Sequence, residues 1–281
     1  MTGYSQNQGI QLLQSLQEEG QYVFDTETAR EHASRIGIKP SYLNPLLSFL
    51  AESNWIVRLK KGLFATSGGL PGNITVHPFA IATSIAQPSA ISHWSAMNYH
   101  GFTEQIPGTV YAISTKKIGT PSMRTGEKML QQSKHAREIA GIRYEYTTVK
   151  REHFFGIQEI WIDEHFKIPI TDKERTLLEG FIKPRAFGGM SEILGILEQN
   201  INGVNIEQLV EYSLQYGVTA VSKRLGWSLE RLGANTGAVI ALKDVPASRY
   251  INLDPTRPSR GKHDKNWMIR VNLTGVQNEA S

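Results

Sequence analysis

The stretch GIKPSYLNPLLSFL, residues 37–50, decides the fold of the N-terminal part of the chain. Gly37 ends one helical pattern, and Pro40 begins the next in the first-turn position that proline tolerates. Pro45 lies inside this second helix, so the sequence predicts either a kink there or a later helix start capped by Asn44. The apolar residues recur at i, i+3, i+4 and i+7, the inward stripe of an amphipathic helix. They are Leu43, Leu46, Leu47 and Leu50.

The segments on either side of this helix complete a small unit. Residues 9–19 and 26–36 have helical patterns, and Asp25 or Thr26 can cap the second of them. Residues 55–59 and 63–66 read as two strands joined through residues 60–62. Three helices followed by a hairpin, with the short Gly-containing link at residues 37–39, predict a winged helix-turn-helix.

In this fold the helix that begins at Pro40 is the recognition helix, and the hairpin is the wing. The predicted helix presents polar side chains outward, and the wing tip carries two lysines. Residues 35–61 hold five basic residues and one acidic residue, whereas the first 34 hold five acidic residues and one arginine. A basic side at the recognition helix and wing is suited to DNA phosphates, and the alternative is a winged helix used only for protein contact. The predicted DNA contacts are Arg35, Lys39, Ser41, Tyr42, Asn44, Ser48, Arg58, Lys60 and Lys61.

A domain boundary is predicted at SGGLPGN, residues 67–73, where three glycines and a proline prevent regular structure. The interpretation is a DNA-binding domain at residues 1–70 and a larger domain at residues 71–281. Because a linker of this composition should be crossed by few contacts, the larger domain is expected to fold alone.

The larger domain mixes helices and strands, so the chain as a whole is predicted to be α+β. Helices are expected at residues 78–86, 89–100, 191–199, 206–216 and 219–232, and another after a capping box at Thr171 and Glu174. Strands are expected at residues 109–114, 141–149, 155–162, 166–170, 250–253 and 267–273. The expected strands and helices do not follow the βαβ alternation that would argue for a parallel sheet. Residues 116–151 and 249–270 are rich in Lys and Arg, and each is either a second nucleic-acid surface or a solvated loop.

Composition limits the remaining choices. The 281 residues are 40% hydrophobic and 20% charged, enough apolar material for a core. Cysteine is absent, which excludes disulfides, thiolate metal sites and a cysteine nucleophile. The absence of a long apolar run and of a signal peptide predicts a cytoplasmic protein without a membrane partner. The net charge of +4 permits nucleic acid as a partner without requiring it.

The residue patterns of the sequence predict no enzyme, no metal site and no cofactor. His93 and His100 are seven residues apart on one expected helix, with no carboxylate ligand between them. His100, near the helix end, is expected to hydrogen-bond a carbonyl or to interact with the helix dipole. The acidic residues of a metal nuclease are present without its spacing; they are Asp163, Glu164, Asp172 and Glu174. Ser92 and Ser95 lack the glycine-flanked turn of a serine hydrolase.

Several motifs resemble the AbiEi-type antitoxins of type IV toxin–antitoxin and abortive-infection systems. Residues 37–64, with the basic wing KKGLF, resemble the family's winged helix. ISHWSAMNYHGF at residues 91–102 resembles its S-x-x-S-A-L-x-x-H-G-L helix. ERTLLE at residues 174–179, with Gly188 and Gly189, resembles its E-R-T-L-L-D and G-G segment. Met97, Glu179 and Pro45 depart from the family pattern, and the last ~80 residues match none of it.

The resemblance implies a DNA-binding autorepressor that binds the double-stranded operator of its own operon. It also implies an antitoxin that counters a cognate nucleotidyltransferase-like toxin, through the C-terminal domain. One alternative is a DNA-targeted, metal-dependent nuclease or modification-associated protein, and another is a protein-binding adaptor with a winged-helix scaffold. A toxin gene next to this one would favour the antitoxin.

Overall fold

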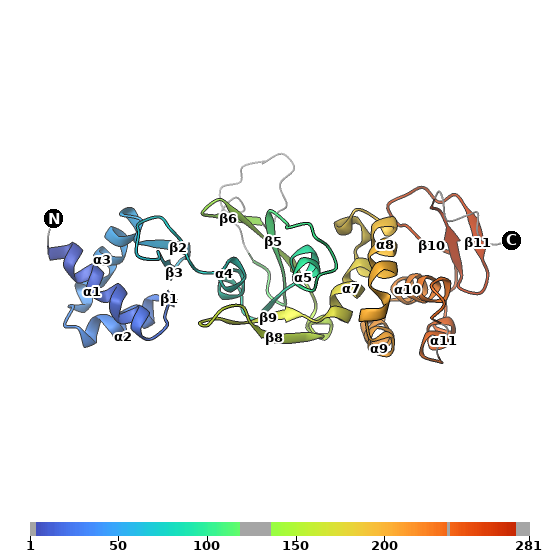
Figure 1. Ribbon diagram of the computed structural model, residues 1–281, viewed down its shortest axis with the longest axis horizontal. Helices are drawn as coiled ribbons and strands as arrows, with labels where there is room; N and C mark the ends of the chain where they lie inside the picture. The colour runs from blue at the N-terminus through green and yellow to red at the C-terminus, as the bar shows by residue number, and fades with distance from the viewer. Residues whose placement is uncertain (1–3, 119–135, 235–236, 274–281) are drawn as a thin grey trace.

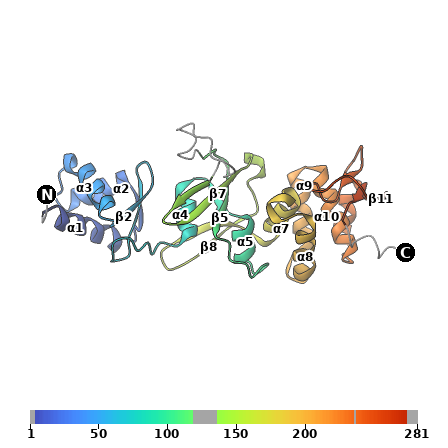
Figure 2. The ribbon, with the colours of Figure 1, turned by 90° about the horizontal axis from the view of Figure 1, so that it is seen from above.

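The computed structural model describes residues 4–118, 136–234 and 237–273. The chain runs along the long axis of the molecule in three parts, from the N-terminal helices through a central sheet to a helical C-terminal part (Figures 1 and 2). Every helix in the described ranges is too short or too polar to cross a membrane. The α+β class predicted from the sequence is confirmed.

The N-terminal part has the arrangement of a winged helix. Its elements are α1 (Tyr4–Glu18), β1 (Val23–Asp25), α2 (Thr26–Arg35), α3 (Pro40–Glu52), β2 (Ile56–Lys60) and β3 (Leu63–Thr66). The three strands form an antiparallel sheet in the order β1-β3-β2. Asp25 caps α2 by accepting a hydrogen bond from Thr28 N at 2.9 Å, which is one of the two predicted caps. The helices and one face of the sheet enclose an N-terminal cluster that includes Leu12, Leu16, Phe24, Leu43, Leu46, Leu50, Ile56 and Phe64.

The central part is a six-stranded sheet in the order β6-β7-β5-β4-β9-β8. Its elements are α4 (Pro78–Ile85), β4 (Ser89–Ile91), α5 (His93–Tyr99), β5 (Thr109–Ser114), β6 (Ala136–Ile139), β7 (Ile142–Thr148), β8 (Ile157–Trp161) and β9 (Lys167–Thr171). The sheet contains parallel pairs that no βαβ alternation in the sequence indicates, since β5 pairs parallel with β7 and β4 with β9. The partners β4 and β9 are separated in the sequence by other strands, so no local βαβ signature marks them.

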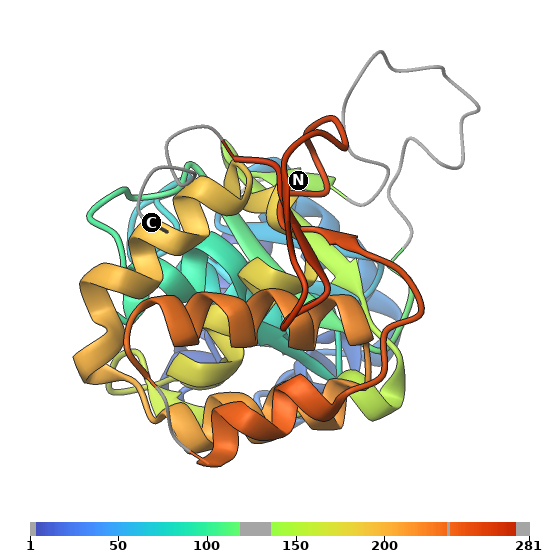
Figure 3. The same ribbon diagram turned by 90° about the vertical axis from the view of Figure 1, so that its right-hand side faces the viewer.

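The C-terminal part packs five helices beside a small sheet. Its elements are α7 (Lys173–Ile182), α8 (Met190–Asn200), α9 (Ile206–Tyr216), α10 (Thr219–Arg231), α11 (Gly237–Asp244), β10 (Ile251–Asn252), β11 (Lys262–Asp264) and β12 (Ile269–Val271). Seen along the long axis, the orange helices lie in front of the green sheet (Figure 3). Two hydrophobic clusters lie mainly in residues beyond 70. The central cluster includes Leu59, Ala65, Ile81, Ile91, Tyr146 and Ile170, and the C-terminal cluster includes Leu177, Phe181, Phe187, Leu225 and Trp267.

Two local predictions require correction. Residues 89–91 are strand β4 rather than the start of a helix, because this buried segment pairs with β5 on one side and β9 on the other. The capping box is wrong as well. Asp172, not Thr171, caps α7 by accepting from Arg175 N at 2.7 Å, and Glu174 Oε1 instead accepts from Asn205 N at 2.8 Å.

Contacts cross the predicted boundary at residues 67–73. Successive residues of the wing strands point to opposite faces, so Ile56 and Phe64 lie in the N-terminal cluster, whereas Leu59 and Ala65 lie in the central cluster. Tyr22 also packs against His165, with ring centroids 4.5 Å apart. Some side chains of the wing therefore pack across this boundary, which turn composition does not reveal. Independent folding of residues 71–281 stays a prediction.

Candidate nucleic-acid interface

The recognition helix α3 is continuous from Pro40 to Glu52, with Pro45 inside it. The alternative start at Pro45, capped by Asn44, is therefore wrong. The four predicted leucines are all buried in the N-terminal cluster, and they fix the orientation of the helix. Its opposite face presents Ser41, Asn44 and Ser48 to solvent, as the spacing predicts.

Tyr42 does not share this outward face. Two residues along a helix correspond to a rotation of about 200°, so Tyr42 and Asn44 point to different sides. Tyr42 is half-buried and packs against the N-terminal cluster. The expectation that it projects outward beside Asn44 is corrected accordingly.

A groove of about 290 Å³ lies between the recognition helix and the wing. It brings together four of the predicted contacts, Asn44 and Ser48 from α3 and Arg58 and Lys61 from the wing. Its remaining lining is Thr26, Leu47, Ala51, Gly62 and Phe64. Two basic side chains therefore adjoin two neutral polar side chains, which suits phosphate contact and hydrogen bonding to base edges respectively.

The wing tip is fixed to the start of α2. Thr26 donates its backbone N–H to Gly62 O at 3.0 Å, and its hydroxyl donates to the same oxygen at 3.4 Å. Gly62 has φ +74°, and a Cβ there would lie 3.3 Å from Thr26 Oγ1, so glycine suits this position. No pattern in the sequence indicates Thr26 as a groove residue, because only the folded hairpin brings it there.

The basic residues differ in how they are held. Arg35 forms an ion pair with Glu19 in the turn after α1, and Lys60 Nζ donates to Ile85 O at 2.9 Å. Arg58, Lys61 and the exposed Lys39 have no hydrogen-bond or ion-pair partner within the described part of the chain. Because Lys60 is turned toward α4, the available charge at the wing lies on Arg58 and Lys61.

The motifs at residues 91–102 and 174–179 meet in a buried junction between α5 and α7. Glu179 Oε2 accepts from the backbone N–H of His93 at 2.8 Å, and Arg175 Nη2 lies 3.6 Å from Glu179 Oε1. His93, Arg175 and Glu179 are all at most 5% exposed. His93 also adopts φ +52°, a conformation that is unfavourable for a residue with a side chain and that the carboxylate of Glu179 holds in place.

This junction lines a cavity of about 280 Å³ but has no catalytic relay. Ser92 Oγ lies 2.8 Å from His93 Nδ1, and Glu179 Oε2 lies 3.3 Å from the same nitrogen. A serine–histidine–acid triad needs the serine and the acid on different ring nitrogens. Burial lowers the pKa of His93, and the charge of Glu179 opposes this shift only in part.

The other residues considered for chemistry have structural partners. His100 Nε2 bonds Thr171 O at 2.7 Å, as expected for a histidine near a helix end. Asp163 accepts from His165 N and Phe166 N in the β8–β9 turn, whereas Asp172 caps α7 at the other end of β9. Within the described ranges, no group of three His, Asp or Glu residues could hold a metal ion.

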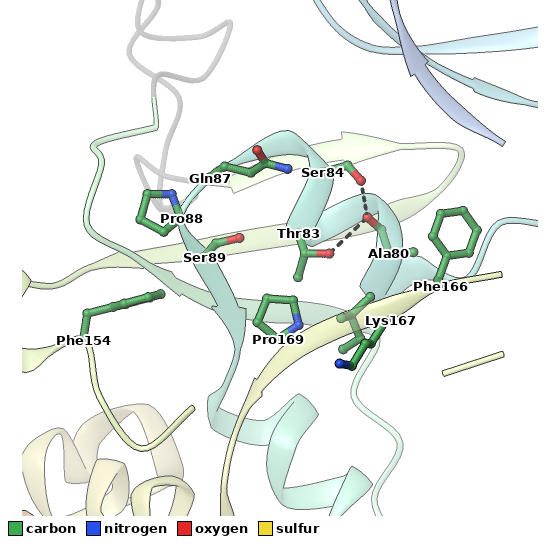
Figure 4. Close-up of a pocket in the computed structure, with 11 residues that line it drawn as sticks. Ala80, Thr83, Ser84, Gln87, Pro88, Ser89, Phe154, Phe166, Lys167 and Pro169 are labelled. Atoms are coloured by element: carbon green, nitrogen blue, oxygen red, sulfur yellow. Dashed lines mark hydrogen bonds between the residues drawn. The ribbon is translucent and has the colours of Figure 1, made fainter. Parts of the chain in front are cut away.

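A further cavity, of about 590 Å³, lies beside α4, β4 and β9. The hydroxyls of Thr83 and Ser84 point back to the carbonyl of Ala80 (Figure 4), at 3.2 and 2.8 Å. Lys167 Nζ lies 2.8 Å from Glu159. Thr83, Ser84 and Lys167, which line this cavity, are thus bound within the fold.

Comparison with known proteins gives a structural match. No family model matches the chain, and no curated protein matches its sequence. A crystal structure of the RV2827C protein from Mycobacterium tuberculosis superimposes with a TM-score of 0.65 at 12% sequence identity, over 94% of this chain and 90% of that chain. At this identity the likeness shows a shared fold, and it extends from the winged-helix part through the larger mixed part.

Proposed function

We propose that this protein is a DNA-binding transcriptional autorepressor and the antitoxin of a type IV toxin–antitoxin system. In this proposal the protein acts in the cytoplasm and has no catalytic step, metal or cofactor. The observation that carries the proposal is the groove between α3 and the wing, where Asn44, Ser48, Arg58 and Lys61 converge.

In this proposal, double-stranded operator DNA lies against α3 with its backbone beside the wing. Arg58 and Lys61 contact phosphates, because they are basic, exposed and without a partner in the described structure. Asn44 and Ser48 face the major groove, where an asparagine can form two hydrogen bonds with adenine. Lys39 and Ser41 lie at the start of the same helix and are suited to contact the flanking phosphate.

The antitoxin role rests on the resemblance of residues 91–102 and 174–179 to the AbiEi-type family. The structure supports treating these motifs as one unit, since His93 and Glu179 bind each other across α5 and α7. The motif residues are mostly buried. They would therefore maintain the shape of the part that counters a nucleotidyltransferase-like toxin, and other, exposed residues would make any contact with it.

The test of repression uses the full chain and the DNA upstream of its own gene. Binding is titrated on that fragment and on random-sequence DNA of equal length, over a series of salt concentrations. Tighter binding to the upstream fragment, lost in the Arg58→Ala/Lys61→Ala variant, supports the proposal. Equal affinity for both DNAs would contradict operator recognition.

The test of neutralisation is separate. A nucleotidyltransferase-like protein encoded beside this gene is expressed alone and with the chain, and growth is measured. The proposal expects the chain to restore growth, and the Arg58→Ala/Lys61→Ala variant to do so equally well. Growth that stays arrested in the presence of folded chain would refute the antitoxin role while leaving the repressor role standing.

A further inference from the structure

A second basic groove lies in the C-terminal part, at the opposite end of the molecule from α3 (Figures 1 and 2). Its volume is about 680 Å³. Arg224 on α10, Arg249 before β10 and Arg270 on β12 converge in it, although they are distant in the sequence. The lining contains no acidic residue; its other members are Ala220, Tyr250, Ile251, Asn252, Pro255 and Ser259.

Asn252 orients two of the three arginines. Its backbone oxygen accepts from Arg224 Nε at 3.0 Å, and its side-chain oxygen accepts from Arg270 Nη1 at 3.2 Å. Its amide nitrogen donates to Ser259 Oγ at 2.7 Å, which fixes the amide orientation. The guanidinium groups are thus held in place before any ligand arrives, which lowers the entropic cost of binding.

Within the described structure, acidic charge reaches this groove at Arg224, where burial lowers the pKa and the charge of Asp254 partly offsets that shift. Arg249 is exposed and has no hydrogen-bond or ion-pair partner among the described residues. The nearby carboxylate of Asp254 is 1% exposed, lies 3.6 Å from Arg257 and accepts bonds from Thr256 and Met190. The exposed Arg249 and the half-buried Arg270 therefore offer positive charge to one open space, and Arg224, 8% exposed, lies at its wall. This arrangement favours an anionic ligand.

An aromatic pair adjoins the arginines. The rings of Tyr250 and His263 are stacked, with centroids 4.1 Å apart and planes at 16°. Arg270 Nε donates to His263 Nε2 at 3.0 Å and so anchors this pair to the groove. A basic channel beside an aromatic ring is the combination with which proteins bind single strands, through phosphate contact and base stacking.

We infer that the groove formed by Arg224, Arg249, Arg270 and Tyr250 binds a single-stranded nucleic acid. The arginines contact successive phosphates, and a base stacks beside Tyr250. Because the groove lies at the far end of the molecule from the winged helix, this site is independent of the proposed operator contact. The inference does not depend on the proposed function.

The test uses full-length chain carrying Arg58→Ala and Lys61→Ala, which removes the proposed winged-helix contribution. A fluorescein-labelled oligothymidine of about 12 nucleotides, within the roughly 4–16 that single-strand grooves cover, is titrated at several salt concentrations. We expect Arg249→Ala to weaken binding several-fold and to reduce the salt slope of log affinity by about 0.7, the value for one phosphate contact on a single strand.

The matched control is Arg260→Ala. Arg260 is exposed, carries the same charge and lies near the groove without lining it. Tyr250→Ala should weaken binding roughly tenfold through lost stacking, whereas Tyr250→Phe should retain the parent affinity. Thermal melting of each variant confirms that the fold is kept. Equal losses for Arg260→Ala and Arg249→Ala would overturn the inference, because diffuse charge would then account for binding.

Competitors distinguish the remaining ligands. A polyglutamate peptide is tested at the same concentration of charge. If it displaces the oligothymidine and this displacement depends on Arg249, the groove would be assigned to an acidic protein partner. Equal competition by thymidine monophosphate would assign it to free nucleotides. Equal Arg249-dependent binding of duplex DNA would remove the single-strand preference. Each of these results refutes the inference as stated.

Discussion

Two polar regions of this molecule differ in how their charges are satisfied. In the α5–α7 junction, the buried Glu179 accepts a hydrogen bond from His93 N and forms an ion pair with the buried Arg175. In the groove between α3 and the wing, Asn44, Arg58 and Lys61 are exposed and turn toward solvent. Motifs occur in both regions, since residues 91–102 and 174–179 meet at the junction and residues 37–64 include the groove. The motif residues of the junction maintain the fold, whereas the proposed interface depends on exposed side chains with few structural constraints.

Removal of the Glu179 carboxylate should give the largest effect. Glu179→Ala leaves the guanidinium of Arg175 buried without its acidic neighbour and removes the acceptor for His93 N, so we expect unfolding to become easier by about 3–5 kcal/mol. Urea unfolding measures this. Glu207→Ala, an exposed carboxylate on α9, is the control and should change stability little. A fully stable Glu179→Ala variant would show that the junction is not structural.

Removal of the wing charges should affect DNA binding and not stability. Arg58→Ala/Lys61→Ala should reduce the salt slope of log affinity by about 1.8, twice the roughly 0.9 expected per phosphate contact. Lys60→Ala is the matched control at the adjacent position. Since Lys60 donates to Ile85 O, its loss should instead cost about 0.5–1.5 kcal/mol of stability with an unchanged slope. The opposite pattern would place Lys60, rather than Lys61, on the DNA.

Replacement of Asn44 should alter specificity alone. Because α3 begins at Pro40, Asn44 has no capping role, and Asn44→Ala should leave the melting temperature unchanged. We expect it to reduce discrimination between operator and random DNA by about 1–3 kcal/mol, with the same salt slope. Ser53→Ala, at the residue that follows the last turn of α3, serves as the comparison. Unchanged discrimination would remove Asn44 from the base contacts.

Acidification should lower the free energy of unfolding through the histidines of the α5 motif, and not through the groove residues. Burial lowers the pKa of both His93 and His100 below the ordinary 6.5. The unfolded chain then binds more protons than the native one below pH 6.5, so stability is fully present above that pH and declines as the pH falls through it. Urea unfolding across this range should show the decline. His100→Gln should flatten it, whereas replacement of the exposed His165 should not.

The sequence predicted those elements whose determinants are local. Helix α9 begins and ends at the predicted residues 206 and 216, because Asn205 caps it and Gly217 ends it. Strand β5 also matches its predicted range, residues 109–114. Strands β1 and β4 have three residues each, too few for a periodic pattern, and their identity depends on partners from distant segments.

The same distinction holds for the candidate interface. The convergence of Asn44 and Ser48 follows from helical spacing, and their proximity to Arg58 follows from the winged-helix pattern. The orientation of Lys60 toward Ile85, and that of Tyr42 toward the N-terminal cluster, depends on packing that no local pattern contains. The arginine groove shows this most clearly, since Arg224 lies on a helix while Arg249 and Arg270 come from a loop and a strand beyond it.

The alternation along the wing strands limits how this protein can evolve. Ile56 and Phe64 serve one hydrophobic cluster, while Leu59 and Ala65 serve the next. A winged helix borrowed from another protein would have to bring both sets of side chains in the same register, since a slip of one residue would exchange them. The winged helix and the central sheet are therefore expected to be inherited together. New operator specificity should arise by substitution on α3 rather than by exchange of the whole winged helix.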